Sequence, residues 1–381
     1  MHNWQPHCDH GRVWSGPSKQ HAGVIMSAFE SPDFDHHETV AFFDDKASGL
    51  KCIIAIHSTA LGAACGGTRV YPYANGDAAL TDVLRLSRGM SYKNAIANLP
   101  LGGGKAVIMG DPAKDKTEAR LLAYGRAVSE LGGRYITAMD VGILPADMPV
   151  IARATKYAAG FDMPGKPSGD SGPPTALGTF VGLKAAIKHR LGADSAKGLT
   201  VAIQGLGKVG ANLAKRLHDE GAKLIVADVN ANATKMVADA FGAKVVSVDD
   251  VVTTECDVFS PNALGAILND QTVGKLHAKV VAGAANNQLA RDEHGAALKA
   301  RGVLYAPDYV INGGGIIRVA GQIFEWSDAE VERRVLAIAD TLTQIFRRAD
   351  SDNLPTNVIA DRIAEERMAA GGKAAKAHAA E

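Results

Sequence analysis

The stretch from Leu199 to Val229, LTVAIQGLGKVGANLAKRLHDEGAKLIVADV, contains the pattern that decides the fold. It begins and ends with runs of β-branched apolar residues, and its middle has the period of an amphipathic helix. This order predicts a strand, a helix and a second strand that lies parallel to the first. Gly205, Gly207 and Gly210 follow the first strand as G-x-G-x-x-G, and Asp228 ends the second strand.

Glycines with this spacing between a strand and a helix are typical of a dinucleotide site. The first permits a tight turn, the second lets backbone approach a pyrophosphate, and the third lets the helix pack closely on the strand. The first turn of the helix offers N–H groups to the phosphates. Asp228 suits ribose hydroxyls and repels a 2′-phosphate, so NAD is predicted rather than NADP. The cofactor residues predicted in this unit are Gly205, Leu206, Gly207, Lys208, Val209, Gly210 and Asp228.

Strand and helix patterns alternate on both sides of this unit. Downstream, VVSV, DVFSP, KVVAGAA and GVLYAP are strand candidates as far as about residue 307. Upstream, the expected elements are a strand at 51–60, a loop with Gly66 and Gly67, a helix over 77–99, a strand at 106–110, a helix over 116–131 and a strand ending at Asp140. The predicted fold class is α/β with two domains, an N-terminal α/β catalytic domain and a Rossmann doubly wound NAD-binding domain, separated by a cleft.

Residues that interrupt or begin regular structure predict the domain boundaries. The Pro-, Gly- and Ser-rich stretch 161–175 has no period and is expected to be a linker or active-site loop. A capping box at 327–330 opens a helix with one apolar stripe through Ile345, and a shorter helix follows Pro355. We expect a non-native or disordered extension at 1–26, the catalytic, substrate and oligomerisation domain at 27–170 with 327–368 returning to it, the Rossmann domain at 171–326 and a flexible tail at 369–381.

Composition excludes several functions. The 381-residue chain has a formal net charge of zero, so no overall field attracts nucleic acid or an anionic membrane. Its four cysteines have no C-x-x-C spacing, and no run of 18 apolar residues or signal peptide occurs, which favours a cytoplasmic protein. His2, His7, Cys8 and His10 crowd into the first residues, but no metal site is predicted there, because an extension upstream of a start at Met26 explains them.

Two lysines flank a glycine turn in MSYKNAIANLPLGGGKAVIMG, residues 90–110. Lys93 is expected within a helix and Lys105 just before a strand. One lysine suits pairing with a substrate carboxylate, and the other, desolvated beside a second cation, suits a general base. An isolated lysine is more often a solvated surface charge. The three glycines before Lys105 argue against that alternative, since they indicate backbone that a ligand approaches closely.

Several segments in a fixed order carry a family resemblance. They are MSYKNAIANLPLGGGKAVI, GAACGGTRV, ITAMDVG, SPNALGAILND, AGAANNQLA and APDYVINGGGIIRVAG, with the glycine-rich dinucleotide unit among them. Together they resemble the glutamate/leucine/phenylalanine/valine dehydrogenase family, above all its leucine and phenylalanine dehydrogenase branch. The resemblance covers roughly residues 35–365.

The resemblance implies NAD-dependent, reversible oxidative deamination of a neutral L-amino acid to a 2-oxo acid and ammonia, by a homo-oligomer. It implies that Lys93 binds the α-carboxylate, that Lys105 and Asp140 are catalytic, and that Asn286 contacts both substrate and nicotinamide. The other substrate-binding residues implied are Gly66, Gly67, Cys65, Ile316 and Val319. The other cofactor-binding residues implied are Arg69, Ser171, Thr175, Ala263, Leu264, Ala284 and Ala285.

The implied mechanism assigns each proton to a residue. Hydride transfer from Cα gives an imine, and Lys105, as a neutral amine, removes a proton from the water that attacks it. Asp140 relays protons to and from the nitrogen so that ammonia leaves. A nearby carboxylate raises the pKa of a lysine, so desolvation and Lys93 must outweigh Asp140 for Lys105 to act as a base.

The residues expected in the side-chain pocket favour two different types of substrate. No matched lysine is present for a glutamate side chain, which favours a neutral substrate. Ile316 and Val319 resemble the walls of leucine-type enzymes, whereas Cys65 is smaller than the leucine usual there, and AIANLPLGGGK resembles the phenylalanine type. Because a methylene or two is worth about 1–3 kcal/mol, activity on Leu, Val, Ile, Met and Phe is expected.

Two other functions stay open at this point. The chain is a catalytically silent NAD-binding regulatory protein if the lysine half serves assembly alone. A 2-hydroxyacid dehydrogenase instead needs a histidine base near a carboxylate-binding arginine, and His57, His189, His218, His277 and His294 have no such setting. Dimer and octamer are both compatible with the sequence.

Overall fold

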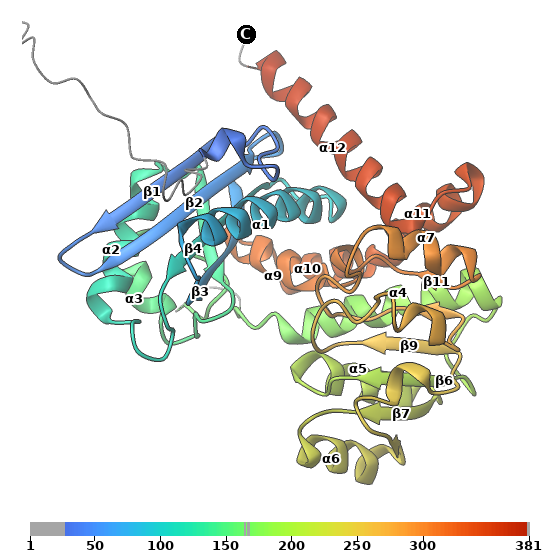
Figure 1. Ribbon diagram of the computed structural model, residues 1–381. Helices are drawn as coiled ribbons and strands as arrows, with labels where there is room; N and C mark the ends of the chain where they lie inside the picture. The colour runs from blue at the N-terminus through green and yellow to red at the C-terminus, as the bar shows by residue number, and fades with distance from the viewer. Residues whose placement is uncertain (1–26, 164, 166–167, 379–381) are drawn as a thin grey trace, which may run out of the picture.

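The computed structural model describes residues 27–163, 165 and 168–378, and it contains two sheets, each covered by helices (Figure 1). The expected N-terminal extension lies outside the described residues. The first sheet has the strand order β1-β2-β4-β3-β5. Its strands are β1 (Thr39–Asp45), β2 (Leu50–Ser58), β3 (Ala64–Tyr71), β4 (Gly102–Met109) and β5 (Tyr135–Met139), and its helices are α1 (Gly76–Ile96), α2 (Glu118–Glu130) and α3 (Met148–Ala152).

Alternation along β2 shows why this sheet is buried on both faces. Ile54 and Ile56 pack in one apolar cluster with Leu121 and Tyr124 of α2. Ile53, on the opposite face, packs in another cluster with the apolar side of α1. Successive side chains of a strand point to opposite faces, so a continuous apolar run is what a strand between two helical layers requires.

Two predictions for this half were wrong. The segment around Gly66 and Gly67, expected as a loop, forms β3, which pairs in parallel with β4 and β5. Strand β4 begins at Gly102 rather than 106, so Lys105 lies within the strand and not before it. Glycine lowers strand propensity, but here it is needed, because a Cβ at Gly66 would overlap the Gly104 carbonyl of the neighbouring strand.

The second sheet is fully parallel, as predicted, with the order β11-β10-β9-β6-β7-β8. The order reverses at β6, which gives a Rossmann-like arrangement with its switch point between β6 and β9. The strands are β6 (Thr200–Gln204), β7 (Lys223–Ala227), β8 (Lys244–Val245), β9 (Val258–Pro261), β10 (Val280–Val281) and β11 (Leu304–Tyr305). The covering helices are α4 (Gly172–Leu191), α5 (Lys208–Asp219), α6 (Ala231–Phe241) and α7 (Glu293–Ala300).

The C-terminal helices differ from their predictions. They are α8 (Asp308–Ile311), α9 (Gly314–Ile323), α10 (Asp328–Leu336), α11 (Ile338–Asp352) and α12 (Thr356–His378). The single helix expected from 327 is divided at Ala337. Ser327 accepts the Glu330 N–H at 3.2 Å, but the predicted capping box is incomplete, since the Glu330 carboxylate binds Arg333 and Arg334 instead.

Helix α12 is longer than the short helix expected after Pro355. The part of the predicted tail that the structure describes, 369–378, continues this helix rather than forming a flexible end. Alanine-rich sequence favours helix, and a Cβ at Gly371 would overlap Leu61, so the helix packs closely on the first half of the chain. None of the described helices combines the length and apolar character that spanning a bilayer requires.

Candidate active site

Lys105 and Asp140 form a tight ion pair where the first sheet meets the second half of the chain. The Lys105 Nζ lies 2.6 Å from Asp140 Oδ2, and Lys105 is only 7% exposed. Lys105 is in β4 and Asp140 directly follows β5, so two strands on either side of β3 bring them together. Burial raises the pKa of Asp140, but the nearby Lys105 and Arg69 outweigh it and hold that pKa below its ordinary value.

Arg69 of β3 supports the same carboxylate. Its Nη1 lies 2.9 Å from Asp82 Oδ2 and its Nε lies 3.5 Å from Asp140 Oδ2. Both partners belong to the first half of the chain, so the described ion pairs of Arg69 are with Asp82 of α1 and with Asp140, the partner of Lys105. Asp82, on the second turn of α1, was not singled out from the sequence, because a lone helical carboxylate is indistinguishable from a solvated one.

Lys93 lies in the last turn of α1, which rests directly on β4. A Cβ at Gly103 would overlap the backbone of Ser91, so that glycine permits the close approach of helix and strand. Burial lowers the pKa of Lys93 to about 8, with Lys105 lowering it further and with Asp308 and Asp140 opposing. The two lysines are therefore electrostatically coupled, as the sequence predicted from their glycine-separated spacing.

Asn286 is held by residues that sequence reasoning missed. Asn312 Nδ2 donates to Asn286 Oδ1 at 2.7 Å and to the Ala284 carbonyl at 3.1 Å. Asp308 accepts the Gln288 N–H at 2.8 Å, which fixes the other end of the loop. Asp308 and Asn312 lie in the quoted APDYVINGGG segment, and polar residues inside an otherwise apolar stretch were the available signal.

The residues expected to line the side-chain pocket are buried together. Cys65 is fully buried, and Ile316 and Val319 are 8% and 9% exposed. All three belong to one apolar cluster that also contains Ala138. Cys65 comes from β3, and the other two come from α9, so the cluster joins the two halves of the chain. Burial raises the pKa of the Cys65 thiol to about 12, so this sulfur is a small apolar group rather than a thiolate.

The glycine loop after β6 fits a dinucleotide. A Cβ at Gly210 would overlap the Gly205 carbonyl, and Gly205 has a φ of +90°, so both positions require glycine. A Cβ at Gly207, in contrast, would meet nothing within 4 Å, which leaves the space above the loop open to a ligand. Asp228 accepts the Leu206 N–H at 2.6 Å and the Asn230 N–H at 2.7 Å, and it retains lone pairs for ribose hydroxyls.

The remaining cofactor candidates surround this loop. Ala263 lies against Gly205, whereas Leu264 is 84% exposed. Asn262 Oδ1 accepts the Ala284 N–H at 2.9 Å, which ties the loops after β9 and β10 together, and Ala285 N–H bonds to Pro261. Ser171 and Thr175 begin α4, whose Gly172 would place a Cβ 3.5 Å from Lys208. The glycine loop thus faces the loops after β9 and β10 and the start of α4. The loop consists of Gly205, Leu206, Gly207, Lys208, Val209 and Gly210.

Comparisons with known proteins agree with this geometry. Residues 36–157 match the family model described as Glu/Leu/Phe/Val dehydrogenase, dimerisation domain, and residues 169–234 and 225–379 match that of Glutamate/Leucine/Phenylalanine/Valine dehydrogenase. Leucine dehydrogenase of Geobacillus stearothermophilus is 49% identical over 343 residues, 90% of this chain and 94% of the relative.

Two further relatives are named for other amino acids. Valine dehydrogenase of Streptomyces albus is 48% identical over 351 residues, 91% of this chain and 96% of that protein. The crystal structure of L-tryptophan dehydrogenase from Nostoc punctiforme superposes with a TM-score of 0.79 at 45% identity, covering 88% of this chain and 96% of the other.

Proposed function

The chain belongs to the Glu/Leu/Phe/Val dehydrogenase family, and on that premise we propose that Lys105 and Asp140 carry the proton transfers of its reaction. It is an amino-acid dehydrogenase that acts on the CH–NH₂ group by oxidative deamination with a nicotinamide cofactor. These relatives give no support to the alternative of a catalytically silent regulatory protein. The observation that carries the proposal is the buried 2.6 Å contact between Lys105 and Asp140.

Each residue of the proposed site has one task. Lys93 binds the substrate carboxylate by charge-assisted hydrogen bonds, and Asn286, oriented by Asn312, contacts substrate and cofactor. The bound nicotinamide supplies the hydride acceptor. Lys105 Nζ, as a neutral amine, removes a proton from the water that attacks the substrate imine. The proton that Lys105 takes from water passes through Asp140 Oδ2, 2.6 Å from Nζ, to the nitrogen of the tetrahedral intermediate, and ammonia and the 2-oxo acid then leave.

An activity panel tests this proposal directly. Reduction of NAD or NADP is followed by absorbance with Leu, Val, Ile, Met, Phe, Trp and Glu as substrates. We expect turnover with NAD and neutral amino acids, and little with Glu, because no cation was matched to its side chain. Absence of turnover with every amino acid, while the cofactor still binds, would contradict the proposed chemistry.

The proposed cofactor is NAD, and Asp228 is the residue that selects it. We expect Asp228→Asn to lower the ratio of kcat/KM for NAD to kcat/KM for NADP at least about tenfold, because it removes the charge that repels a 2′-phosphate. Asp219→Asn, which removes the same charge from the exposed end of α5, is the control and should leave the ratio unchanged. An unaltered ratio in Asp228→Asn would refute this role.

The proposed substrate is a neutral amino acid whose side chain lies against Cys65, Ile316 and Val319. We expect Cys65→Leu to lower kcat/KM for Phe more than for Val, since the added bulk narrows the pocket. Cys52→Leu overpacks a buried position in the other apolar cluster and should affect both substrates equally. Equal losses for Phe and Val in Cys65→Leu would contradict the pocket assignment.

The titration of Lys93 predicts how carboxylate binding depends on pH. Only the protonated amine attracts a carboxylate, and its pKa is about 8, so binding is lost as pH rises through this value. We expect the inhibition constant of 4-methylpentanoate, which lacks an amino group, to rise up to about tenfold per pH unit above 8. In Lys93→Arg, whose guanidinium stays charged, the rise should be absent. A flat profile in the unaltered enzyme would show that another group binds the carboxylate.

The domain roles and the assembly are also proposals. Residues 27–170, with 327–368, supply the catalytic lysines and the contacts between subunits of a homo-oligomer, and residues 171–326 bind the cofactor. The family model for 36–157 is described as a dimerisation domain, which supports this division. A cytoplasmic location is proposed from the free cysteines Cys52, Cys65 and Cys256.

A further inference from the structure

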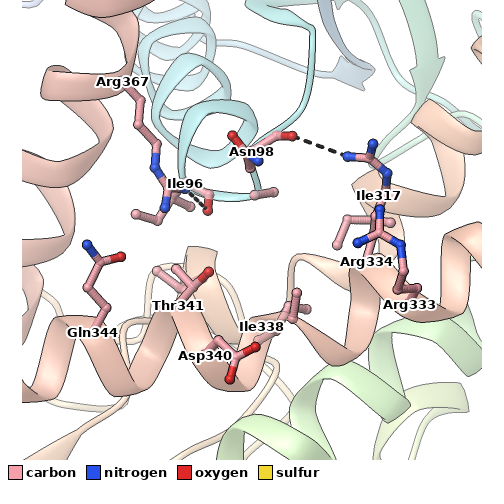
Figure 2. A pocket seen from close by; sticks show the side chains of 13 residues that line it. Ile96, Asn98, Ile317, Arg333, Arg334, Ile338, Asp340, Thr341, Gln344 and Arg367 are labelled. Atoms are coloured by element: carbon pink, nitrogen blue, oxygen red, sulfur yellow. Dashed lines mark hydrogen bonds between the residues drawn. The ribbon is translucent and has the colours of Figure 1, made fainter.

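A cavity with a volume of about 330 Å³ lies apart from the catalytic pair, neither of whose residues lines it (Figure 2). One wall is the C-terminal end of α1, including Ile96 and Asn98. The opposite side is formed by α10 and α11, and α12 contributes Arg367. Figure 2 shows Arg367 and Gln344 on one side of the space, Arg333 and Arg334 on the other, and Thr341 projecting from α11 between them. A volume of this size accommodates a small metabolite.

The three arginines are only partly used by their present partners. Arg333 and Arg334 share the carboxylate of Glu330, at 2.6 to 2.8 Å. Arg334 also donates from Nη1 to the Asn98 carbonyl at 3.4 Å, and its guanidinium lies 3.9 Å from the centre of the Trp326 ring. Arg367 Nη1 donates to the carbonyls of Ala95 and Ile96, at 3.1 and 2.6 Å. Among the described residues, Nη1 of Arg333, Nη2 of Arg334, and Nε and Nη2 of Arg367 have no hydrogen-bond acceptor. A guanidinium has five N–H donors, so each arginine keeps capacity for a ligand.

Charge and polarity agree with a donor-rich site. The cavity wall contains three guanidinium groups and a single carboxylate, Asp340. When Glu330 is counted as well, the three arginines and two carboxylates have a net charge of +1. Burial lowers the pKa of Arg367, whose described hydrogen-bond acceptors are neutral carbonyls, so an anion nearby would stabilise its charged form. Thr341, Asn98 and Gln344 add hydroxyl and amide groups to the same wall.

We propose that this cavity is a binding site for a small anion with a carboxylate or phosphate group, distinct from the amino-acid and cofactor sites. Planar guanidinium groups from two sides suit the several acceptor oxygens of such a group. The cavity adjoins both halves of the substrate site, because Ile96 lies about one helical turn after Lys93 and Ile317 follows Ile316. An occupant therefore contacts the helices that position the carboxylate-binding lysine and the side-chain pocket.

Isothermal titration of the full-length protein at low ionic strength tests the site. Inorganic phosphate and succinate are the two probes, and saturating NAD is present so that the glycine loop is already filled. The cavity variants are Arg333→Gln combined with Thr341→Val, and Gln344→Glu, which places a negative charge on an exposed position of the wall. Arg348→Gln is the control, because this arginine of α11 pairs with Glu366 outside the cavity and its loss changes the net charge equally.

We expect at least one probe to bind the unaltered protein and Arg348→Gln equally, and both cavity variants at least about tenfold more weakly. Binding of phosphate alone would identify the ligand group as a phosphate, and binding of succinate alone as a carboxylate. Equal affinity in all the proteins would place the anion elsewhere and overturn the proposal. Absence of saturable binding of either probe up to about 10 mM would also overturn it, leaving Arg333 and Arg334 as partners of Glu330 and Arg367 as a partner of the α1 carbonyls. Amino-acid turnover, measured in parallel, reports whether each variant is folded.

Discussion

Replacing Lys105 by methionine is expected to lower kcat roughly 10³-fold while cofactor binding is retained, because the site loses its general base. Methionine keeps the length and apolar body of the side chain, so the packing of β4 is little changed. The glycine loop proposed to bind the cofactor follows β6 of the other sheet and is not touched by the substitution. Steady-state kinetics and titration of NADH fluorescence measure the two effects separately.

The same half of the chain offers a matched control in Lys116. Its Nζ lies 2.6 Å from Asp147 Oδ2, the same distance as in the Lys105–Asp140 pair, and its side chain is 11% exposed against 8% for Lys105. Lys116→Met therefore loses an equivalent ion pair with a comparable cost in stability. We expect its kcat to stay within about twofold of the unaltered enzyme. If Lys105→Met kept more than a few per cent of the activity, the assignment of the base would be wrong.

Gly103→Ala is expected to damage both stability and catalysis, since its Cβ would overlap the Ser91 backbone and push α1 away from β4. Overpacking of this kind costs about 1–3 kcal/mol. The displacement also separates Lys93 from Lys105, and a shift of about 1 Å in a positioned group can cost roughly 10²-fold in rate. Thermal denaturation and kcat/KM for the amino acid are the measurements.

Gly89→Ala provides the comparison on α1 itself. This glycine is exposed in the helix and a Cβ there would meet nothing within 4 Å, so alanine should raise stability by about 0.5–1 kcal/mol without affecting kcat/KM. The two substitutions add the same methyl group, one on β4 where α1 packs against it and the other on the exposed side of α1. Equal behaviour of both variants would contradict the claim that Gly103 sets the distance between α1 and β4.

The second sheet was predictable from the sequence because its signals are local. Gly205, Gly207, Gly210 and Asp228 lie within one β-α-β unit, and apolar runs mark the parallel strands that follow. The coupling of Lys93 and Lys105 was also predictable, since only five residues separate the end of α1, whose last turn contains Lys93, from the start of β4, which contains Lys105.

Other features depend on contacts between distant segments. Strand β3 is defined by its pairing with β4 and β5. Its glycines have low strand propensity, so the sequence of the segment did not predict a strand. Asn312 binds Asn286, 26 residues earlier, and Asp308 binds Gln288, 20 residues earlier. Contacts between residues so far apart in the chain leave no pattern in the local sequence. Gly371 of α12 packs closely against Leu61, 310 residues earlier in the chain, and only the fold reveals this contact.

The glycines of β3 and β4 have a consequence for redesigning the substrate range. A Cβ at Gly66, Gly67, Gly102, Gly103 or Gly104 would overlap backbone or packed side chains. Main chain rather than side chains therefore forms this part of β3 and β4. Mutant libraries at these positions would therefore consist mostly of inactive proteins. Variation is better directed to Cys65, Ile316 and Val319, where a substitution changes a side chain of the proposed pocket and leaves the backbone of β3 and β4 in place.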